Sequence, residues 1–329
     1  MTIVSRRTLL GATAVTPLAA LGLTACSDGA GAGGGATLRV GELGAAPVTQ
    51  ELFKAAGLDQ DLPYAIEWKQ FVNAGPEYIE AAGADAVDVG FTADTPLIFA
   101  AANGVGLKAV AVASPDDPNT SGNAILAGKG TGISSIEDLK GRKVSFQEGT
   151  ITQYHVVKAL ESVGLTLDDI EPVNLPVVDG NTALANGEAD AVATLGIYWG
   201  QAEAGGATVV ATGAGFIPGN SLLSARTAII DDEAYTDALA DYIDRFARAQ
   251  QWRYDHVDEW AEIYAGLTGL DAALIKTTET RAPVTLGPVT DATIADQQDQ
   301  ADVYTALGII GELDAADQFD DSFTSAFEA

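Results

Sequence analysis

Residues 86–96 read AVDVGFTADTP, and they pass from an apolar strand directly into the first turn of a helix. Pro96 falls in this first turn, where the N–H group that proline lacks would have no helical partner. A second stretch of the same design, RKVSFQEGTITQ at residues 142–153, joins a strand to a helix through Gly149. Because strands that alternate with helices form mostly parallel sheets covered on both faces, these two stretches predict an α/β fold.

The same alternation extends outward from both stretches. Residues 134–137, SSIE, resemble a capping box, and the short helix that they open should end at Gly141. After residue 228 the pattern changes to the periodicity of long amphipathic helices. We expect strands at residues 36–40, 64–71, 86–91, 107–113, 124–127, 142–147, 189–195 and 208–211, and helices at 49–56, 76–82, from 95, 150–163, 233–254 and 257–267.

Two α/β units in series fit two domain arrangements. They are either two independent domains, or two lobes between which the chain crosses near Gly122 and returns near Leu222. The midpoint of the chain has no Pro- or Gly-rich linker, and this favours the two lobes. The 329 residues are enough to give each unit a sizeable core.

The chain is strongly acidic. It has 17 Lys and Arg against 46 Asp and Glu, which gives a formal net charge of −29 at pH 7. Such a surface repels phosphate backbones and anionic lipid, so we expect no nucleic-acid partner. The simpler explanation of the charge is that it keeps the protein soluble. A content of 47% hydrophobic and 19% charged residues is typical of a folded globular protein.

The N-terminus predicts an export signal in residues 1–25. Arg6 and Arg7 are the only charges of this segment, and apolar and small residues follow from 9 to 23. This order is typical of a secretory signal, and the apolar part is too short for a membrane-spanning helix. Residues 5–10, SRRTLL, resemble the twin-arginine motif, so both the twin-arginine and the general export route stay open.

Cys26 ends the sequence LTAC, which resembles the bacterial lipobox, where the cysteine is acylated and becomes the new N-terminus. Residues 26–35 are rich in Gly and Ala and predict a flexible linker behind the lipid anchor. Because Cys26 is the only cysteine, the folded body has no disulfide. We expect an exported protein that its lipid holds at the outer face of the cell membrane or in the periplasm.

Several motifs in order along the chain resemble one family. Together they are similar to the periplasmic solute-binding proteins for aliphatic sulfonates, a group that stands beside the taurine and nitrate binders. The similarity covers nearly all of the chain after the signal. The motifs are FVNAGP at residues 71–76, DVGFTADTP at 88–96, IEDLKGRKVSFQEG at 136–149, NGEADA at 186–191 and TRAPVTL at 280–286.

The resemblance implies a type II periplasmic-binding-protein fold, in which two parallel-sheet lobes are joined by a hinge. Lobe 1 would comprise residues 36–122 and 223–329 with the C-terminal helices, and lobe 2 residues 123–222. The resemblance also implies a monomer without a cofactor. This monomer would enclose a small organic anion, would be attached to the membrane through its lipid, and would deliver the ligand to an ABC permease with its ATPase.

The turn before residue 151 is the strongest candidate for the anion site. Gly149 lets the backbone approach a ligand closely, and Thr150 and Thr152 add hydroxyl groups to the unpaired amides of a helix start. Gln153 follows in the first turn. A helix start holds an anion without Lys or Arg, which suits so acidic a protein. The alternative is that either threonine serves only as a helix cap.

Four further residues fall at strand ends that face the cleft in the family. Asp94 and Thr95 either contact the ligand or cap their helix. Glu42 stands where the family carries a Gln-Lys pair, and a carboxylate there is unfavourable for a bare anion. Tyr198 either covers an apolar ligand tail or packs in the core beside Trp199.

Other charged residues predict structure rather than chemistry. Arg226 and Arg281 are expected in structural or interlobe ion pairs. The only histidines are His155 and His256, so the chain has no Cys/His pair, and no metal-ligand spacing is present. We therefore expect no catalytic residue, no metal and no enzyme.

Alternative functions stay open at this point. The ligand of a binding protein could also be taurine, nitrate or a pyrimidine or thiamine precursor. A protein of another class would be an enzyme on the same fold, from menaquinone or pyrimidine-precursor biosynthesis. The third alternative is a surface sensor that reports its ligand to a membrane receptor.

Overall fold

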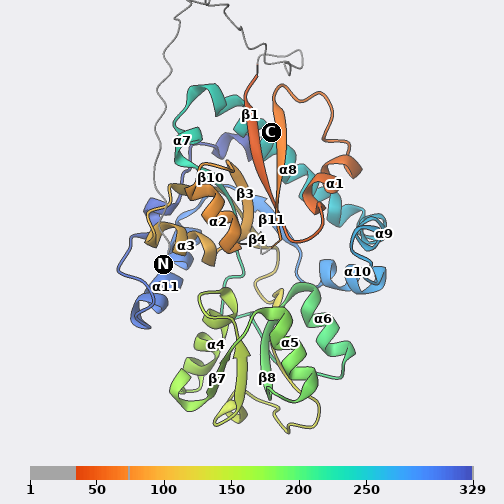
Figure 1. Ribbon diagram of the computed structural model, residues 1–329, viewed down its shortest axis with the longest axis vertical. Helices are drawn as coiled ribbons and strands as arrows, with labels where there is room; N and C mark the ends of the chain where they lie inside the picture. Colours follow the sequence, from red (N-terminus) through yellow and green to blue (C-terminus); the bar gives the residue numbers. More distant parts are fainter. Residues whose placement is uncertain (1–34, 73–74, 328–329) are drawn as a thin grey trace, which may run out of the picture. The chain divides into compact units, whose positions relative to one another are not determined.

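The computed structural model describes residues 35–72 and 75–327, and the described chain forms two β-sheets, each with its own helices (Figure 1). The predicted signal peptide, Cys26 and all of the predicted linker except its last residue lie outside the described residues.

The first sheet has six strands in the order β11-β4-β10-β3-β1-β2, and we call the part of the chain built on it lobe 1. Strands β1, β2 and β3 are parallel, β10 is antiparallel to β3 and β4, and β11 is antiparallel to β4. The strands are β1 (Thr37–Leu43), β2 (Ala65–Phe71), β3 (Val89–Ala93), β4 (Leu107–Pro115), β10 (Ser221–Arg226) and β11 (Val284–Gly287).

The second sheet has five strands in the order β7-β6-β8-β5-β9, and we call the part of the chain built on it lobe 2. Strands β6, β7 and β8 are parallel, whereas β5 is antiparallel to β8 and β9. The strands are β5 (Asn123–Ala127), β6 (Lys143–Phe146), β7 (Glu171–Asn174), β8 (Ala191–Leu195) and β9 (Thr208–Thr212).

The chain crosses between the sheets through residues 116–122 and returns through 213–220. Leu222 already pairs with Thr92 and Val112 in the first sheet, so the return crossing ends before it. Each crossing leads into an antiparallel strand, because it enters the new sheet at the edge where the parallel strands end. The α/β fold class is confirmed, but the two sheets are mixed rather than wholly parallel.

The helices agree with the sequence where their periodicity is strong. The two long helices expected after residue 228 are confirmed as α8 and α9, whereas α5, α6, α10 and α11 were not predicted. The helices are α1 (Val48–Ala55), α2 (Gly75–Gly83), α3 (Thr95–Ala102), α4 (Ile151–Ser162), α5 (Val177–Asn186), α6 (Gly196–Ala204), α7 (Thr227–Ile230), α8 (Glu233–Asp255), α9 (Val257–Thr268), α10 (Ala272–Arg281) and α11 (Asp291–Ala306).

The capping box expected at SSIE is wrong. Asp138, not Glu137, accepts hydrogen bonds from the backbone N–H groups of Ser134 and Ser135, at 2.9 and 3.0 Å. The Asp138 side chain, one residue after the predicted Glu137, therefore caps this turn. Only a single 3₁₀ turn follows, at Glu137–Leu139.

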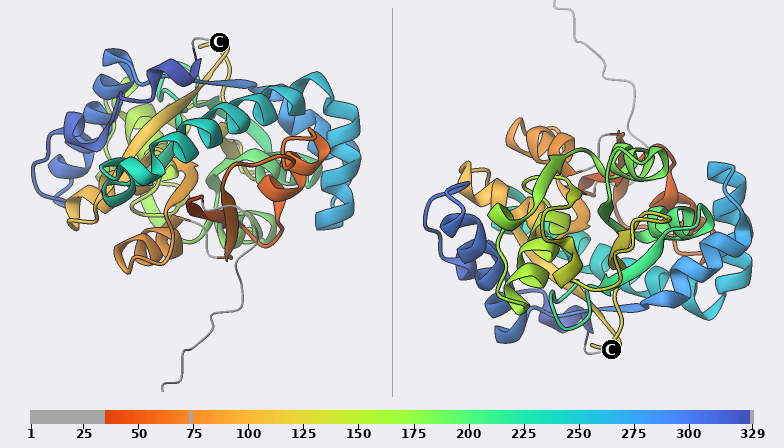
Figure 2. Two further views of the ribbon diagram at one scale, coloured as in Figure 1. Left: turned by 90° about the horizontal axis from the view of Figure 1, so that it is seen from above. Right: turned by 90° about the horizontal axis from the view of Figure 1, so that it is seen from below.

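Each sheet has its own hydrophobic core. Viewed from above, α8 runs across lobe 1, and viewed from below, the green helices of lobe 2 lie on their sheet (Figure 2). Phe53, Tyr242, Phe246 and Trp260 are fully buried in the core of lobe 1, and Phe146 is buried in that of lobe 2. Among the described helices, none is both long and apolar enough to cross a membrane.

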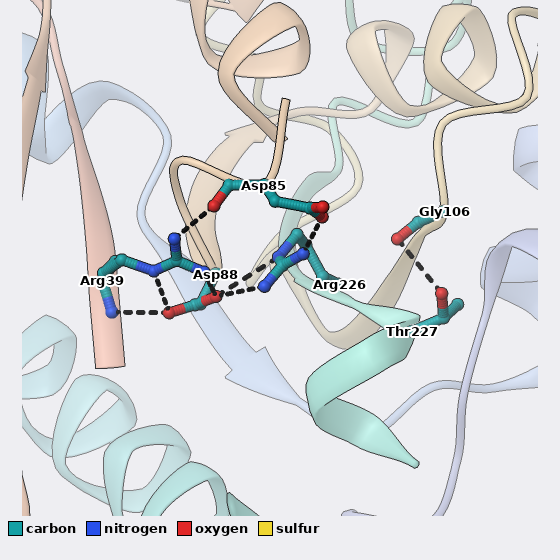
Figure 3. A network of polar contacts seen from close by, with 6 residues as sticks. All are labelled: Arg39, Asp85, Asp88, Gly106, Arg226 and Thr227. Atoms are coloured by element: carbon teal, nitrogen blue, oxygen red, sulfur yellow. Dashed lines mark hydrogen bonds and ion pairs between the residues drawn. The ribbon is translucent and has the colours of Figure 1, made fainter. Parts of the chain in front are cut away.

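A buried ion network holds the amino-terminal edge of the first sheet (Figure 3). Asp88 is 1% exposed and accepts hydrogen bonds from Nε of Arg39 at 2.8 Å and from a terminal nitrogen of Arg226 at 2.8 Å. Arg226 also pairs with Asp85. Burial alone would raise the pKa of Asp88, but the hydrogen bonds from both arginines outweigh it and lower the pKa. Arg226 is therefore a structural residue within lobe 1.

Candidate ligand-binding site

The carboxyl edges of the two sheets face each other, because both short crossings connect these edges. Asn123, the first residue of β5, pairs with Leu195 at the end of β8, and Ser221, the first residue of β10, pairs with Ala93 at the end of β3. Ligands of α/β proteins bind outside the carboxyl ends of the strands. The predicted site residues all belong to β1, or to the turns and helix starts that follow β3, β6 and β8.

The side chain of Glu42 caps the amino-terminal end of α1 in lobe 1. Its carboxylate is 2% exposed and accepts hydrogen bonds from the N–H groups of Thr49 and Gln50 in α1, at 2.8 and 3.0 Å. Burial raises the pKa of Glu42, although these two amides oppose the shift. The side chain therefore occupies the place that an external anion would take at this helix.

Asp94 caps the amino-terminal end of α3 in lobe 1. It accepts a hydrogen bond from the N–H of Thr95 at 2.7 Å, and burial raises its pKa to about 6. From α11, Gln300 donates to the Thr95 hydroxyl at 2.9 Å and Gln297 donates to the Asp94 carbonyl at 3.2 Å. Asp94 thus caps α3, and both Asp94 and Thr95, the first residue of this helix, anchor α3 to α11.

The turn before α4 is organised by its own side chains. The Gly149 N–H donates to Oε1 of Gln153 at 2.8 Å, and the Gln147 N–H donates to the hydroxyl oxygen of Thr152 at 3.1 Å. The Thr150 hydroxyl donates to the Gln147 carbonyl at 2.7 Å. The hydroxyls therefore shape the turn, and the N–H groups of Thr150 and Ile151 remain without an acceptor in the described chain.

The α4 turn and the α3 start meet on α11. The Tyr304 hydroxyl donates to the Thr150 carbonyl at 2.7 Å, and Tyr304 lies one helical turn beyond Gln300, which holds Asp94 and Thr95. A Cβ atom added to Gly149, whose φ is +70°, would lie 3.1 Å from the Phe99 ring. The structure thus brings Asp94, Thr95, Gly149 and Thr150 together.

Tyr198 lies at the start of α6, the helix that follows β8. Because β8 is the direct neighbour of β6, the α4 and α6 starts emerge from strands about 5 Å apart. Tyr198 lines two hollows. One, of about 750 Å³, lies between α5 and α6, and the other, of about 260 Å³, lies between the α6 start and helices α9 and α10.

Beside Tyr198, Trp199 is buried and connects the lobes. The Arg281 guanidinium from α10 stacks 3.7 Å above the Trp199 ring and pairs with Glu203 of α6 at 2.8 Å. Of the structural and interlobe ion pairs expected for Arg281, the structure shows an interlobe one. Gly200 belongs to the same contact, since a Cβ atom there would lie 2.4 Å from a methyl group of Leu274.

The two lobes differ in how their helix starts are capped. In lobe 1, buried carboxylates cap α1 and α3, through Glu42 and Asp94. In lobe 2, α4 is capped by the neutral Thr150, and among the described residues no side chain caps α5 or α6. At the carboxyl edge of lobe 2, the starts of α4 and α6 carry no acid in their first turns and attract an anion, whereas α5 carries Asp179 there. The edge of lobe 1 presents acids that repel an anion.

Sequence reasoning missed four residues of this region: Tyr264, Glu279, Gln300 and Tyr304. They belong to α9, α10 and α11, far along the chain from the strand ends that they contact. The motif TRAPVTL at residues 280–286 is the family motif nearest to them in the sequence.

Residues 50–249, more than half of the chain, match the model of the NMT1/THI5-like family. The chain belongs to this family. A relative is the putative aliphatic sulfonates-binding protein of Escherichia coli strain K12, which is 31% identical over 242 residues, 73% of this chain and 74% of the relative. The family resemblance found in the sequence is thereby confirmed.

Solved structures of family relatives share the fold. The periplasmic aliphatic sulphonate binding protein SsuA from Escherichia coli has a TM-score of 0.77 and 28% identity, over 86% of this chain and 92% of that one. The alkanesulfonate-binding protein SsuA from Xanthomonas axonopodis pv. citri, bound to MOPS, has a TM-score of 0.76 and 24% identity, over 86% and 98%.

The fold also occurs in an enzyme. The desulfurization enzyme DSZB has a TM-score of 0.59 and 15% identity over 88% of this chain and 97% of its own. Fold alone therefore does not separate a binding protein from an enzyme.

Proposed function

We propose that this protein is the solute-binding component of an ABC importer, and that it captures an aliphatic sulfonate or a related small organic anion between its lobes. The observation that carries this proposal is the difference between the helix starts of the two lobes. The relatives that share most of the chain are named as sulfonate-binding proteins, and a helix start without an acidic cap favours the negative charge of a sulfonate.

The anionic head would bind at lobe 2. The N–H groups of Thr150 and Ile151 lie at the start of α4 and have no acceptor among the described residues, whereas the N–H groups of Gln147, Glu148 and Gly149 are already bonded. Thr152 and Gln153 act by holding the turn in shape, and Gly149 lets the ligand approach its backbone. Tyr198 stands on the neighbouring helix start, where its ring would cover the tail of the ligand.

Closure of the lobes would follow binding. The crossings at 116–122 and 213–220 form the hinge, and the ligand bridges the two carboxyl edges. The closed form is the state that the permease and its ATPase would recognise, so free protein should dock poorly. We further propose that residues 1–25 direct export, that Cys26 carries the lipid anchor, and that the binding protein acts as a monomer.

No residue of the site is arranged for catalysis. His155 is 1% exposed, and burial lowers its pKa to about 4, so its ring is neutral at pH 7 and donates from Nε2 to the Thr212 carbonyl at 3.2 Å. His256 is on the surface and bonds to the Trp252 carbonyl at 3.1 Å. We therefore propose a binding protein rather than an enzyme.

The test uses Ile151→Pro, which removes one free N–H from the anion site. Proline fits the first position of a helix, and the extended backbone of Thr150 (φ −134°, ψ 167°) suits a residue that precedes proline. We expect calorimetry with butane-1-sulfonate to show at least tenfold weaker binding, the loss of one hydrogen bond to a charged group. Ile151→Val is the matched control, because it trims the side chain but keeps the N–H.

The control variant should bind butane-1-sulfonate like the wild type. Equal binding by Ile151→Pro and Ile151→Val would contradict the proposed anion site. If the wild type binds no sulfonate but binds a carboxylate or a nitrogenous compound, the protein remains a solute-binding protein and the sulfonate is the wrong ligand.

A further inference from the structure

The Thr150 carbonyl and the Ile151 N–H belong to one peptide group. Because a trans peptide is planar, these two bonds point in opposite directions, and whatever holds the carbonyl also fixes the direction of the N–H. The N–H groups of Gln153 and Tyr154 hold the carbonyl from within α4, at 3.0 and 3.2 Å. Tyr304 of α11 adds a third hydrogen bond, at 2.7 Å, and it is the only described side chain that donates to this oxygen.

Tyr304 is held in place by its packing and by its helix. Its side chain is fully buried, and its ring makes an edge-to-face contact with Phe99 at 5.4 Å between ring centres. Burial and the charge of Asp94 raise the pKa of the hydroxyl, so it keeps its proton and acts as a donor. On the same helix, Gln297 and Gln300 anchor α11 to the start of α3 through hydrogen bonds of 3.2 and 2.9 Å. Lobe 1 therefore holds the donor that the peptide in lobe 2 receives.

This hydrogen bond also changes the charge distribution of the peptide. A hydroxyl that donates to a peptide oxygen draws electron density toward that oxygen, and the N–H of the same peptide becomes a stronger donor. The strengthening is about 10–30% per bond. The Ile151 N–H has no acceptor among the described residues, so an anion bound there would receive this stronger hydrogen bond.

We propose that Tyr304 is a positioning residue of the anion site, and that its hydroxyl, acting from lobe 1 without contact to the ligand, orients and polarises the peptide whose N–H binds the sulfonate in lobe 2. This inference rests on the proposed function and adds a residue of α11 to its site. The affinity of one lobe for the anion is then set in part by a side chain of the other lobe.

The experiment compares two tyrosines that join α4 and α11. Tyr304→Phe removes the donor to the Thr150 carbonyl. Tyr154→Phe removes a hydrogen bond of the same contact, to Asp299 at 2.5 Å, which does not involve this peptide. Both substitutions keep the ring in the apolar cluster that the two helices share. By calorimetry with butane-1-sulfonate we expect Tyr304→Phe to bind about fourfold more weakly, and Tyr154→Phe to bind within about twofold of the wild type.

Two further measurements separate positioning from a general loss of structure. In Ile151→Pro, which lacks the N–H, an added Tyr304→Phe substitution should cause no further loss of affinity, because the group on which the hydroxyl acts is absent. The second measurement is nuclear magnetic resonance of ligand-free protein whose isoleucines carry isotopic nitrogen. The amide signal of Ile151, which Ile151→Val identifies by its disappearance, should shift in Tyr304→Phe and stay in place in Tyr154→Phe.

The outcomes distinguish this inference from the proposed function. If Tyr304→Phe binds butane-1-sulfonate like the wild type, or if both tyrosine variants lose affinity equally, the inference is wrong and the proposed function stands. A further loss of affinity when Tyr304→Phe is added to Ile151→Pro likewise overturns the inference alone. A wild type that binds no butane-1-sulfonate overturns the proposed sulfonate site and the inference with it.

Discussion

Arg226→Met tests the buried ion network of lobe 1. The substitution removes two hydrogen bonds to Asp88, from Nε at 3.2 Å and from a terminal nitrogen at 2.8 Å, and it removes the ion pair with Asp85. Asp88 is 1% exposed, so water does not replace the lost donors. Arg39 still holds this carboxylate, which limits the damage.

The expected loss is about 3 kcal/mol of unfolding free energy. Hydrogen bonds to charged groups contribute about 1.5 kcal/mol or more each, and loss of one partner from a buried ion pair costs about 3–5 kcal/mol. The matched control is Arg248→Met, which removes an exposed pair with Asp244 four residues away and should cost less than about 0.5 kcal/mol.

Urea unfolding of the purified variants measures both values. Binding of butane-1-sulfonate should be unchanged in both folded variants, because the network lies at the opposite edge of the sheet from the cleft. A loss within about 0.5 kcal/mol of the control would show that the Arg226 network does not stabilise lobe 1. Weaker ligand binding by folded Arg226→Met would show that the network is not independent of the cleft.

Three further perturbations test the site. Burial raises the pKa of Asp94 to about 6, so the folded state binds its proton more tightly and this group's contribution to stability falls as pH rises from about 4 to 6. In urea unfolding, Asp94→Asn should therefore gain about 3 kcal/mol of unfolding free energy relative to the wild type across this range. A difference between the two proteins that does not change with pH would contradict the burial of a charged group. Gly149→Ala should weaken sulfonate binding at least about tenfold, because the added methyl group meets the Phe99 ring and displaces the turn. The control Gly164→Ala is also at positive φ but in open space, and it should cost only about 1 kcal/mol of unfolding free energy. Equal sulfonate binding by the two variants would argue against a close approach of the ligand to the Gly149 backbone. Arg281→Met should remove about 2 kcal/mol of stabilising contact between the lobes, from the Trp199 ring and Glu203. X-ray scattering of the ligand-free variant should then show a larger radius of gyration than that of the wild type. An unchanged radius would show that this contact does not hold the lobes together.

The sequence was sufficient where structure is local. Positive φ at Gly149 and the threonine cap of α4 follow from neighbouring residues, and both were predictable from the turn itself. The long helices after residue 228 carry a periodicity that only a helix explains.

The rest depends on contacts between distant parts of the chain. Glu42 caps α1, and this required knowing that its side chain turns back onto amides seven and eight residues later. Tyr304 reaches the Thr150 carbonyl from more than 150 residues away, so no local pattern marks it. Helix α11 escaped prediction because two of its four buried residues, Gln297 and Gln300, are polar and interrupt the apolar periodicity.

A crystal structure of the protein grown with butane-1-sulfonate tests the central claim most directly. We expect the sulfonate between the lobes, with its oxygens about 3 Å from the backbone nitrogens of Thr150 and Ile151 at the start of α4. A sulfonate bound instead among the acids of lobe 1, or a cleft empty at saturating ligand, would contradict it.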